Sequence, residues 1–207
     1  MTKYSFDGGY DDGYAAVPCL WGKEPGLLVK RFLSQRSLST DFRVLDLGCG
    51  EGKNSAAFAK RGVDVTAVDC SSKAISNGQS AFPDLSIQWI NADALDFDIE
   101  SDSFDLIIAY GLLHCLPHIG GVTSLLKRIK RGTKLNGYNI MCAFNSRSQD
   151  LSAHPGFNPI LISHDWYVSQ YSNWDVELAT DMDLHESHPH NGILHHHSLT
   201  RIIARFA

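Results

Sequence analysis

The chain has 207 residues, a length that fits one domain with a substantial buried core. Its formal net charge of -5 comes with scattered Lys and Arg rather than a basic stripe, which argues against nucleic acid and favours a small-molecule partner. No apolar run reaches the roughly 18 residues that a transmembrane helix needs, and the first residues lack a signal-peptide core, so we expect a soluble, cytoplasmic protein.

Residues 1–25 form an N-terminal segment whose glycines and proline allow it to fold over a neighbouring site as a lid. Tyr14 and Trp21 are the candidates in this segment for contact with a substrate. The alternative is that both rings simply pack against the domain, because large aromatic side chains usually serve to bury apolar surface.

The most informative pattern begins at residues 44–47, a short apolar run typical of a buried parallel strand. Residues 48–52 carry glycine at every second position, so the chain can turn sharply while its backbone N–H groups approach a ligand closely. A helix is predicted over residues 53–61, with its N-terminus directed at that ligand. A strand, a glycine loop and a helix in this order describe a nucleoside-binding site.

Three carboxylates narrow the choice of cofactor. Asp69 ends the next predicted strand, where it can accept hydrogen bonds from both hydroxyls of a ribose. The loop spacing is G-x-G-x-G rather than the G-x-G-x-x-G of dinucleotide folds, Asp46 lies two residues before the first glycine, and Glu51 lies within the loop. A carboxylate would repel a pyrophosphate, whereas S-adenosylmethionine has no phosphate and carries a sulfonium and an ammonium. The pattern resembles the class I S-adenosylmethionine-dependent methyltransferases.

Strands and helices continue to alternate, which implies a parallel sheet that binds ligands beyond the carboxyl ends of its strands. The predicted elements that follow are a helix from Ser71 or Ser72 to Ser80, strands at 85–90, 104–110 and 137–144, and a helix at 117–132. The last third predicts a short helix at 163–171 and two strands, 174–186 and 193–206, around the hairpin signal Asn191-Gly192.

The resemblance implies a single α/β domain over residues 1–207 with a Rossmann-like, mostly parallel sheet of order 3-2-1-4-5-7-6 and a C-terminal antiparallel hairpin. It also implies that S-adenosylmethionine lies at the carboxyl ends of the first strands. The residues expected to contact it are Asp46, Gly48, Cys49, Gly50, Asp69, Cys70, Asp93, Ala94 and Tyr110.

Histidines are concentrated in the last third of the chain, at positions 164, 185, 188, 190, 195, 196 and 197. If Asn191-Gly192 is a two-residue turn, His188 faces His195 and Glu186 faces His197 on one face of the hairpin. Such a group suits a substrate or catalytic site, a divalent metal site, or an ordinary polar hairpin, and these alternatives remain open. A loop longer than two residues is a further alternative, because a proline at position 189 interrupts the ladder.

The chain also resembles the tellurite-resistance methyltransferase family. The motifs that carry this resemblance are Tyr10-Asp11-Asp12-Gly13-Tyr14, the run from Leu45 to Ser55, Gly137-Tyr138-Asn139-Ile140, Leu184-His185 and Ile203-Ala204-Arg205. The resemblance implies methyl transfer to a small, soft nucleophile such as a chalcogen oxyanion or a thiol, with His185 near the substrate. The chain departs from the family at Glu186, where the compared member has Arg, so recognition of an anionic oxyanion is in doubt and the added histidines suggest a different acceptor.

Methyl transfer is an in-line displacement, in which holding the two reactants in line contributes most of the acceleration. A histidine acting as general base would add about two to four orders of magnitude. The candidates for this base are His185, His195, His197 and His114, the last on the loop after the fourth strand, and the candidate substrate residues are Tyr14, Trp21, His114 and Glu186. For His114 the alternative is a loop residue packed near the cofactor. Alternative functions are O- or N-methylation in a small-molecule biosynthetic pathway, or S-adenosylmethionine binding without catalysis by a regulator.

Overall fold

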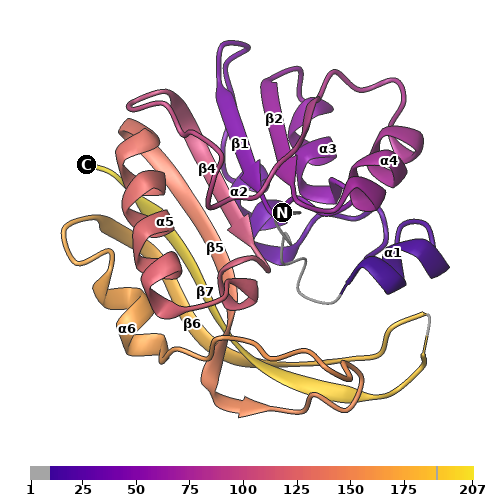
Figure 1. Cartoon of the computed structure of the whole chain (residues 1–207). Helices are drawn as coiled ribbons and strands as arrows, with labels where there is room; N and C mark the ends of the chain where they lie inside the picture. Colours follow the sequence, from indigo (N-terminus) through magenta and orange to yellow (C-terminus); the bar gives the residue numbers. More distant parts are fainter. Residues whose placement is uncertain (1–9, 190) are drawn as a thin grey trace.

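A computed structural model describes residues 10–189 and 191–207, and a seven-stranded sheet of order β3-β2-β1-β4-β5-β7-β6 runs through it (Figure 1). The strands are β1 (Arg43–Leu47), β2 (Asp64–Asp69), β3 (Gln88–Asn91), β4 (Phe104–Tyr110), β5 (Thr133–Gln149), β6 (Asp175–Glu186) and β7 (His195–Arg205). The first five strands pair in parallel, and β7 is antiparallel to both β5 and β6. The predicted fold, strand order and C-terminal hairpin are confirmed.

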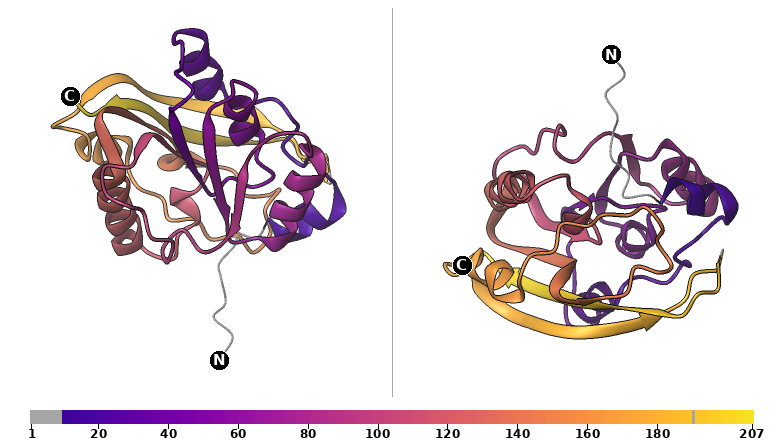
Figure 2. Two further views of the ribbon diagram at one scale, coloured as in Figure 1. Left: turned by 90° about the horizontal axis from the view of Figure 1, so that it is seen from above. Right: turned by 60° about the horizontal axis from the view of Figure 1, so that its bottom comes forward.

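Helices cover both faces of this sheet (Figure 2). They are α1 (Asp11–Ala16), α2 (Leu27–Ser34), α3 (Lys53–Ala59), α4 (Ser72–Ala81), α5 (Ile119–Gly132) and α6 (His164–Ser169), with a 3₁₀ helix η1 (Leu113–Cys115) after β4. Side chains of α2 and α3 pack on one face, and those of α5 and α6 pack on the other. Successive strand residues point to opposite faces, so the continuous apolar runs of the central strands bury both faces. No helix in the described ranges is both long and apolar enough to cross a membrane.

Side-chain caps fix two helix starts. The Ser71 hydroxyl accepts a hydrogen bond from the Ala74 N–H at 3.0 Å, so α4 begins at the serine pair as predicted. His118 caps α5 in the same way, because its Nδ1 accepts the Gly121 N–H at 2.9 Å. The helix therefore starts two residues after Pro117, the predicted first residue.

The predicted register of the C-terminal hairpin is wrong by two residues. The structure pairs Glu186 with His195 rather than with His197, and His188 lies in the loop rather than opposite His195. A shift of two residues leaves each side chain on its predicted face, because side chains of a strand alternate with a period of two. Glu186, His195 and His197 therefore still share one face of the hairpin.

Residues 187–194 form the loop that replaces the predicted two-residue turn. Asn191 Oδ1 accepts the N–H of Ile193 at 3.1 Å, and Gly192 has a φ of 66°, so the Asn-Gly pair makes its turn inside a longer loop. Pro189 has no N–H to donate to a strand ladder, which explains why the strands separate before it. His190 lies outside the described residues.

Candidate active site

A cavity of about 370 Å³ lies beyond the carboxyl ends of β1, β2 and β4, a volume in the range of small-molecule sites. In Figure 1 the long strands β5, β6 and β7 sweep beneath these ends, and α1 lies to one side. The predicted cofactor residues that line the cavity are Gly48, Cys49, Gly50, Asp69, Cys70, Asp93, Ala94 and Tyr110. The predicted substrate residues that line it are Tyr14, Trp21, His114 and Glu186. One cavity thus contains both predicted groups.

Glycine is required in the loop after β1 for two reasons. Gly48, Gly50 and Gly52 have φ angles of 66°, 54° and 77°, a region that side chains rarely adopt. A Cβ at Gly52 would also lie 2.2 Å from the Trp89 ring, and one at Gly50 would lie 2.9 Å from the Tyr14 hydroxyl. Neighbouring protein side chains, as well as a ligand, therefore exclude larger residues here.

Asp69 holds the glycine loop and faces the cavity at the end of β2. Its Oδ2 accepts the Gly50 N–H at 2.7 Å, and its Oδ1 accepts the Ser71 N–H at 2.9 Å. Each carboxylate oxygen has a second lone pair, so the same side chain can still accept hydrogen bonds from ligand hydroxyls.

Asp46 is placed differently from the other predicted cofactor residues, because it does not line the cavity. It lies beneath the loop, 1% exposed, where its Oδ2 accepts the Ser55 hydroxyl at 2.6 Å. Its Oδ1 has no hydrogen-bond partner within the described ranges, and burial raises the pKa of Asp46 to about 7. The structure thus gives Asp46 a position that supports α3 and the loop rather than one that touches a ligand in this cavity.

The described part of the N-terminal segment is fastened to the cofactor end of the cavity. Glu51 Oε1 accepts hydrogen bonds from the Cys19 N–H at 2.8 Å and from the Asn77 amide at 2.9 Å. Lys53 donates to the backbone oxygen of Trp21 at 3.1 Å. Acidic and basic side chains around the glycine loop therefore hold this segment against it, while residues 1–9 of the predicted lid lie outside the described residues.

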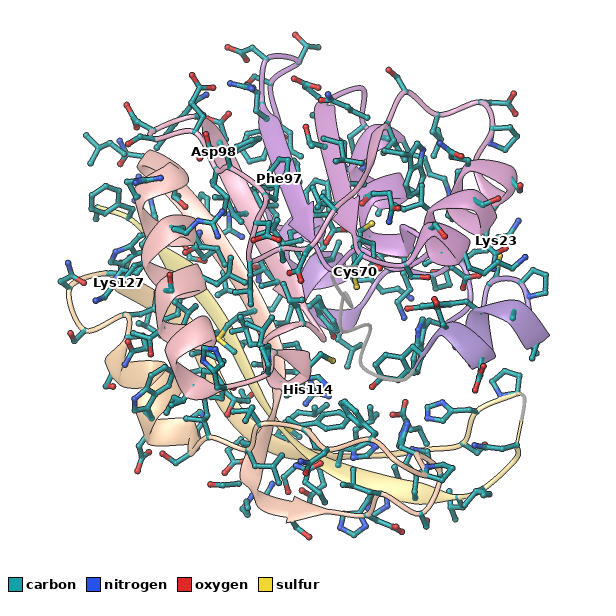
Figure 3. All side chains as sticks on the ribbon, viewed as in Figure 1. Lys23, Cys70, Phe97, Asp98, His114 and Lys127 are labelled. Atoms are coloured by element: carbon teal, nitrogen blue, oxygen red, sulfur yellow. The ribbon has the colours of Figure 1, made fainter. Side chains whose placement is uncertain are left out.

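His114 lines the cavity from η1 (Figure 3). Its Nδ1 accepts the Phe144 N–H at 3.2 Å, and its ring stacks on the Phe144 ring with centroids 3.9 Å apart. Burial lowers the pKa of His114 to about 3, so the ring is neutral at pH 7 and its proton lies on Nε2. That Nε2 is itself buried and has no hydrogen-bond partner among the residues described, so its burial and the low pKa both argue against His114 as a general base.

Arg201 is a cavity residue that the sequence analysis missed. It lies on β7, 9% exposed, and lines the cavity near Tyr110 and Cys142. Burial raises the pKa of Cys142 to about 11 even though the Arg201 charge acts in the opposite direction. An arginine inside an otherwise apolar strand could have indicated this position in the sequence, because buried charged side chains are rare unless they are paired or functional.

Apart from His114, none of the histidines predicted to act as the base lines the cavity. His185 is exposed on the outer face of the hairpin, where its ring lies 5.7 Å from that of His196. His195 and His197 are buried behind the cavity wall, and burial with neighbouring imidazoles lowers the pKa of His197 to about 3. The alternation of side chains along β6 and β7 explains both positions, since it turns His185 outward and the other two inward.

His154 joins these inward histidines and was also missed. It lies in the segment after β5, lines the cavity, and has its Nε2 3.3 Å from the Nε2 of His195. No local pattern in the sequence predicts this contact, because the two residues are separated by 41 positions.

Comparisons with known proteins agree with this geometry. Residues 44–137, from β1 into β5, match a family model described as a methyltransferase domain. Over these residues the chain is similar to a methyltransferase domain. This confirms the predicted relation to the S-adenosylmethionine-dependent methyltransferases, since the match, the glycine loop and the strand order all agree.

Curated relatives include methyltransferases of several names. The chain is 35% identical over 162 residues to a demethylmenaquinone methyltransferase of Beutenbergia cavernae, covering 70% of this chain and 64% of that protein. It is 32% identical over 149 residues to a probable S-adenosyl-L-methionine-dependent methyltransferase, TehB, of Haemophilus influenzae, covering 70% of this chain and 51% of TehB. A demethylmenaquinone methyltransferase of Clavibacter sepedonicus is 33% identical over 106 residues, 50% of this chain and 42% of that protein. The chain thus spans between 42% and 64% of the length of these relatives.

Solved structures share the fold. The crystal structure of Haemophilus influenzae TehB superposes with a TM-score of 0.75 at 23% identity, covering 88% of this chain and 63% of that chain. A structure titled for the conversion of a disulfide bond into a thioacetal group in echinomycin biosynthesis gives a TM-score of 0.71 at 21% identity, covering 97% of this chain and 91% of that chain. The second superposition extends over nearly all of both chains.

Proposed function

We propose that this protein transfers the methyl group of S-adenosylmethionine to a small acceptor that presents a thiol or a chalcogen oxyanion. One observation carries the proposal. A single cavity has the methyltransferase glycine loop at one end and, at the other, a cation, a carboxylate and a neutral imidazole, namely Arg201, Glu186 and His114.

The cofactor end suits S-adenosylmethionine because its polar groups are mostly acidic. Asp69 and Asp93 line the cavity beside Glu51, and none of them would favour a phosphate. The match of residues 44–137 to a methyltransferase domain supports the same cofactor. Asp69 is the residue that accepts the ribose hydroxyls, since it ends β2 next to the glycine loop.

The acceptor end suits an anion or a soft nucleophile. Arg201 supplies the positive charge that the glutamate at position 186 had put in doubt, and the neutral His114 ring lines the same cavity. Glu186 lies on the same wall, and burial raises its pKa, which makes it a stronger base than an exposed glutamate. In this arrangement Glu186 removes the proton of a thiol, while Arg201 holds an oxyanion.

The test is to measure S-adenosylhomocysteine formation by the untagged protein with a panel of acceptors. Selenite, tellurite and small thiols are compared with phenols, amines and a naphthoquinol. We expect turnover with the thiols or the oxyanions to exceed that with the other acceptors. Turnover confined to a phenol, an amine or the quinol would replace the proposed acceptor class, and cofactor binding without turnover on any of them would favour a regulator.

A further inference from the structure

Four imidazole rings meet in the wall beside the cavity, and we name them the histidine cluster: His154, His188, His195 and His197. The Nε2 of His154 lies 3.1 Å from that of His188. It lies 3.3 Å from the Nε2 of His195 and 3.3 Å from that of His197. The Nε2 of His154 therefore lies within 3.3 Å of the Nε2 atoms of the other three rings.

The outer nitrogens of two of these rings fix where their protons are. His195 Nδ1 lies 2.8 Å from the backbone oxygen of Ile193, which can only accept, so His195 donates from Nδ1. His197 Nδ1 lies 2.9 Å from Gln149 Oε1. The orientation of this amide is fixed, because Gln149 Nε2 donates to the backbone oxygens of Asn145 and Ser198 at 2.7 and 2.9 Å.

His197 therefore also donates from Nδ1, and the neutral His195 and His197 rings both direct an Nε2 lone pair toward His154. The His154 Nε2 can carry at most one proton. That proton cannot be shared by the lone pairs of His195 and His197 and by the Nε2 of His188 at the same time. Lone pairs this close repel each other unless a positive charge lies between them. A cation bound at the centre of the cluster would satisfy these lone pairs.

We propose that the histidine cluster binds one divalent transition-metal ion through its Nε2 atoms. Ring nitrogens that bind zinc at 2.0–2.1 Å in a tetrahedron lie about 3.3–3.4 Å apart, close to the three separations from His154 Nε2. The ligand atoms of His154, His188 and His195 also all lie within 4.8 Å of one another. Imidazole ligands suit zinc, copper, iron and nickel rather than magnesium or calcium. The hydrogen bonds from Nδ1 of His195 and His197 to oxygen atoms are the contacts that orient metal-binding histidines in known sites.

The ion would lie in the wall at the acceptor end of the cavity, because His154 and Glu186 both line it. Glu186 Oε1 lies 3.9 Å from the Nε2 of His195 and 4.0 Å from that of His197, close enough for its negative charge to stabilise a bound ion. The ion would also join the segment after β5 to the hairpin. The site goes beyond the proposed methyl transfer and does not depend on it.

The experiment uses the full chain without a histidine tag, freed of metal by chelation and titrated with Zn²⁺ in a calorimeter. We expect one ion per chain and a melting temperature that rises with Zn²⁺. His154→Ala, at a half-buried position, should weaken Zn²⁺ binding at least about a hundredfold, and Gln149→Leu should weaken it about 10–100-fold. The matched control is the double variant His185→Ala, His196→Ala, which removes two histidines from the outer face and should bind Zn²⁺ as the unmodified chain does.

Co²⁺ gives a second readout that does not depend on any variant folding. Tetrahedral nitrogen coordination should produce strong visible absorption that Zn²⁺ displaces. The proposal is overturned if no ion binds in a one-to-one ratio, if the Co²⁺ spectrum is that of a weakly absorbing octahedral ion, or if the control variant loses as much affinity as His154→Ala. In the first case the cluster shares a proton rather than a metal.

Discussion

The two ends of the cavity are built in different ways. At the cofactor end, one strand, loop and helix form the glycine loop, and Asp69 at the end of the next strand holds it through the backbone N–H groups of Gly50 and Ser71. At the acceptor end, side chains from η1, the segment after β5, β6 and β7 converge, namely His114, His154, Glu186 and Arg201. The first end follows local sequence, whereas the second depends on how the hairpin packs against the rest of the sheet.

The largest expected effect is at the acceptor end, for the variant Glu186→Gln. If Glu186 removes the acceptor proton, kcat with thiols should fall by about two to four orders of magnitude. Oxyanion acceptors carry no proton that must leave, so their rates should change much less. Initial rates on both classes, with cofactor affinity as the control, measure the difference, and equal losses on both would contradict a role as base.

Arg201→Met should come next, because it removes the cation of the acceptor end. Hydrogen bonds to charged groups contribute about 1.5–3 kcal/mol, so KM for an oxyanion should rise roughly ten- to a hundredfold. Arg201→Lys keeps the charge and should recover part of the loss. If KM for the oxyanion is unchanged in Arg201→Met while the protein stays folded, this arginine does not bind the acceptor.

Asp69→Ala tests the other end of the cavity. It should weaken S-adenosylmethionine binding by about 1 to 3 kcal/mol through loss of charge-assisted hydrogen bonds. Calorimetry measures the affinity, and Asp69→Asn, which keeps the shape of the side chain, separates this loss from a disturbed loop. Full affinity in both variants would remove Asp69 from the ribose site.

The last prediction concerns the pH dependence of stability rather than activity, and it concerns Asp46, which supports the loop from beneath. Its pKa is raised from 3.8 to about 7 by burial, so the folded chain binds this proton more tightly than the unfolded chain does. Its contribution to the free energy of unfolding should therefore rise as pH falls from about 7 to 3.8, by at most about 1.4 kcal/mol per pH unit. Urea unfolding of the ligand-free protein and of Asp46→Asn at several pH values checks this, and parallel curves would contradict it.

The sequence by itself determined the alternation of strands and helices and most of the cofactor end, while the family resemblance implied the strand order. Those features depend on apolar strands, the glycine loop and the carboxylate that ends β2, all of which are read from neighbouring residues. Local sequence did not predict the whole loop at 187–194. Asn191-Gly192 predicted a turn in the right place, but not the length of the loop around it.

The tertiary structure decided the acceptor end. The sequence indicated that Glu186, His195 and His197 share a face, because alternation along a strand survives a two-residue shift of register. It could not indicate that these rings meet His154, or that Arg201 enters the cavity. Those contacts join segments far apart in the chain, and only the packing of the hairpin against β5 and the segment after it brings them together.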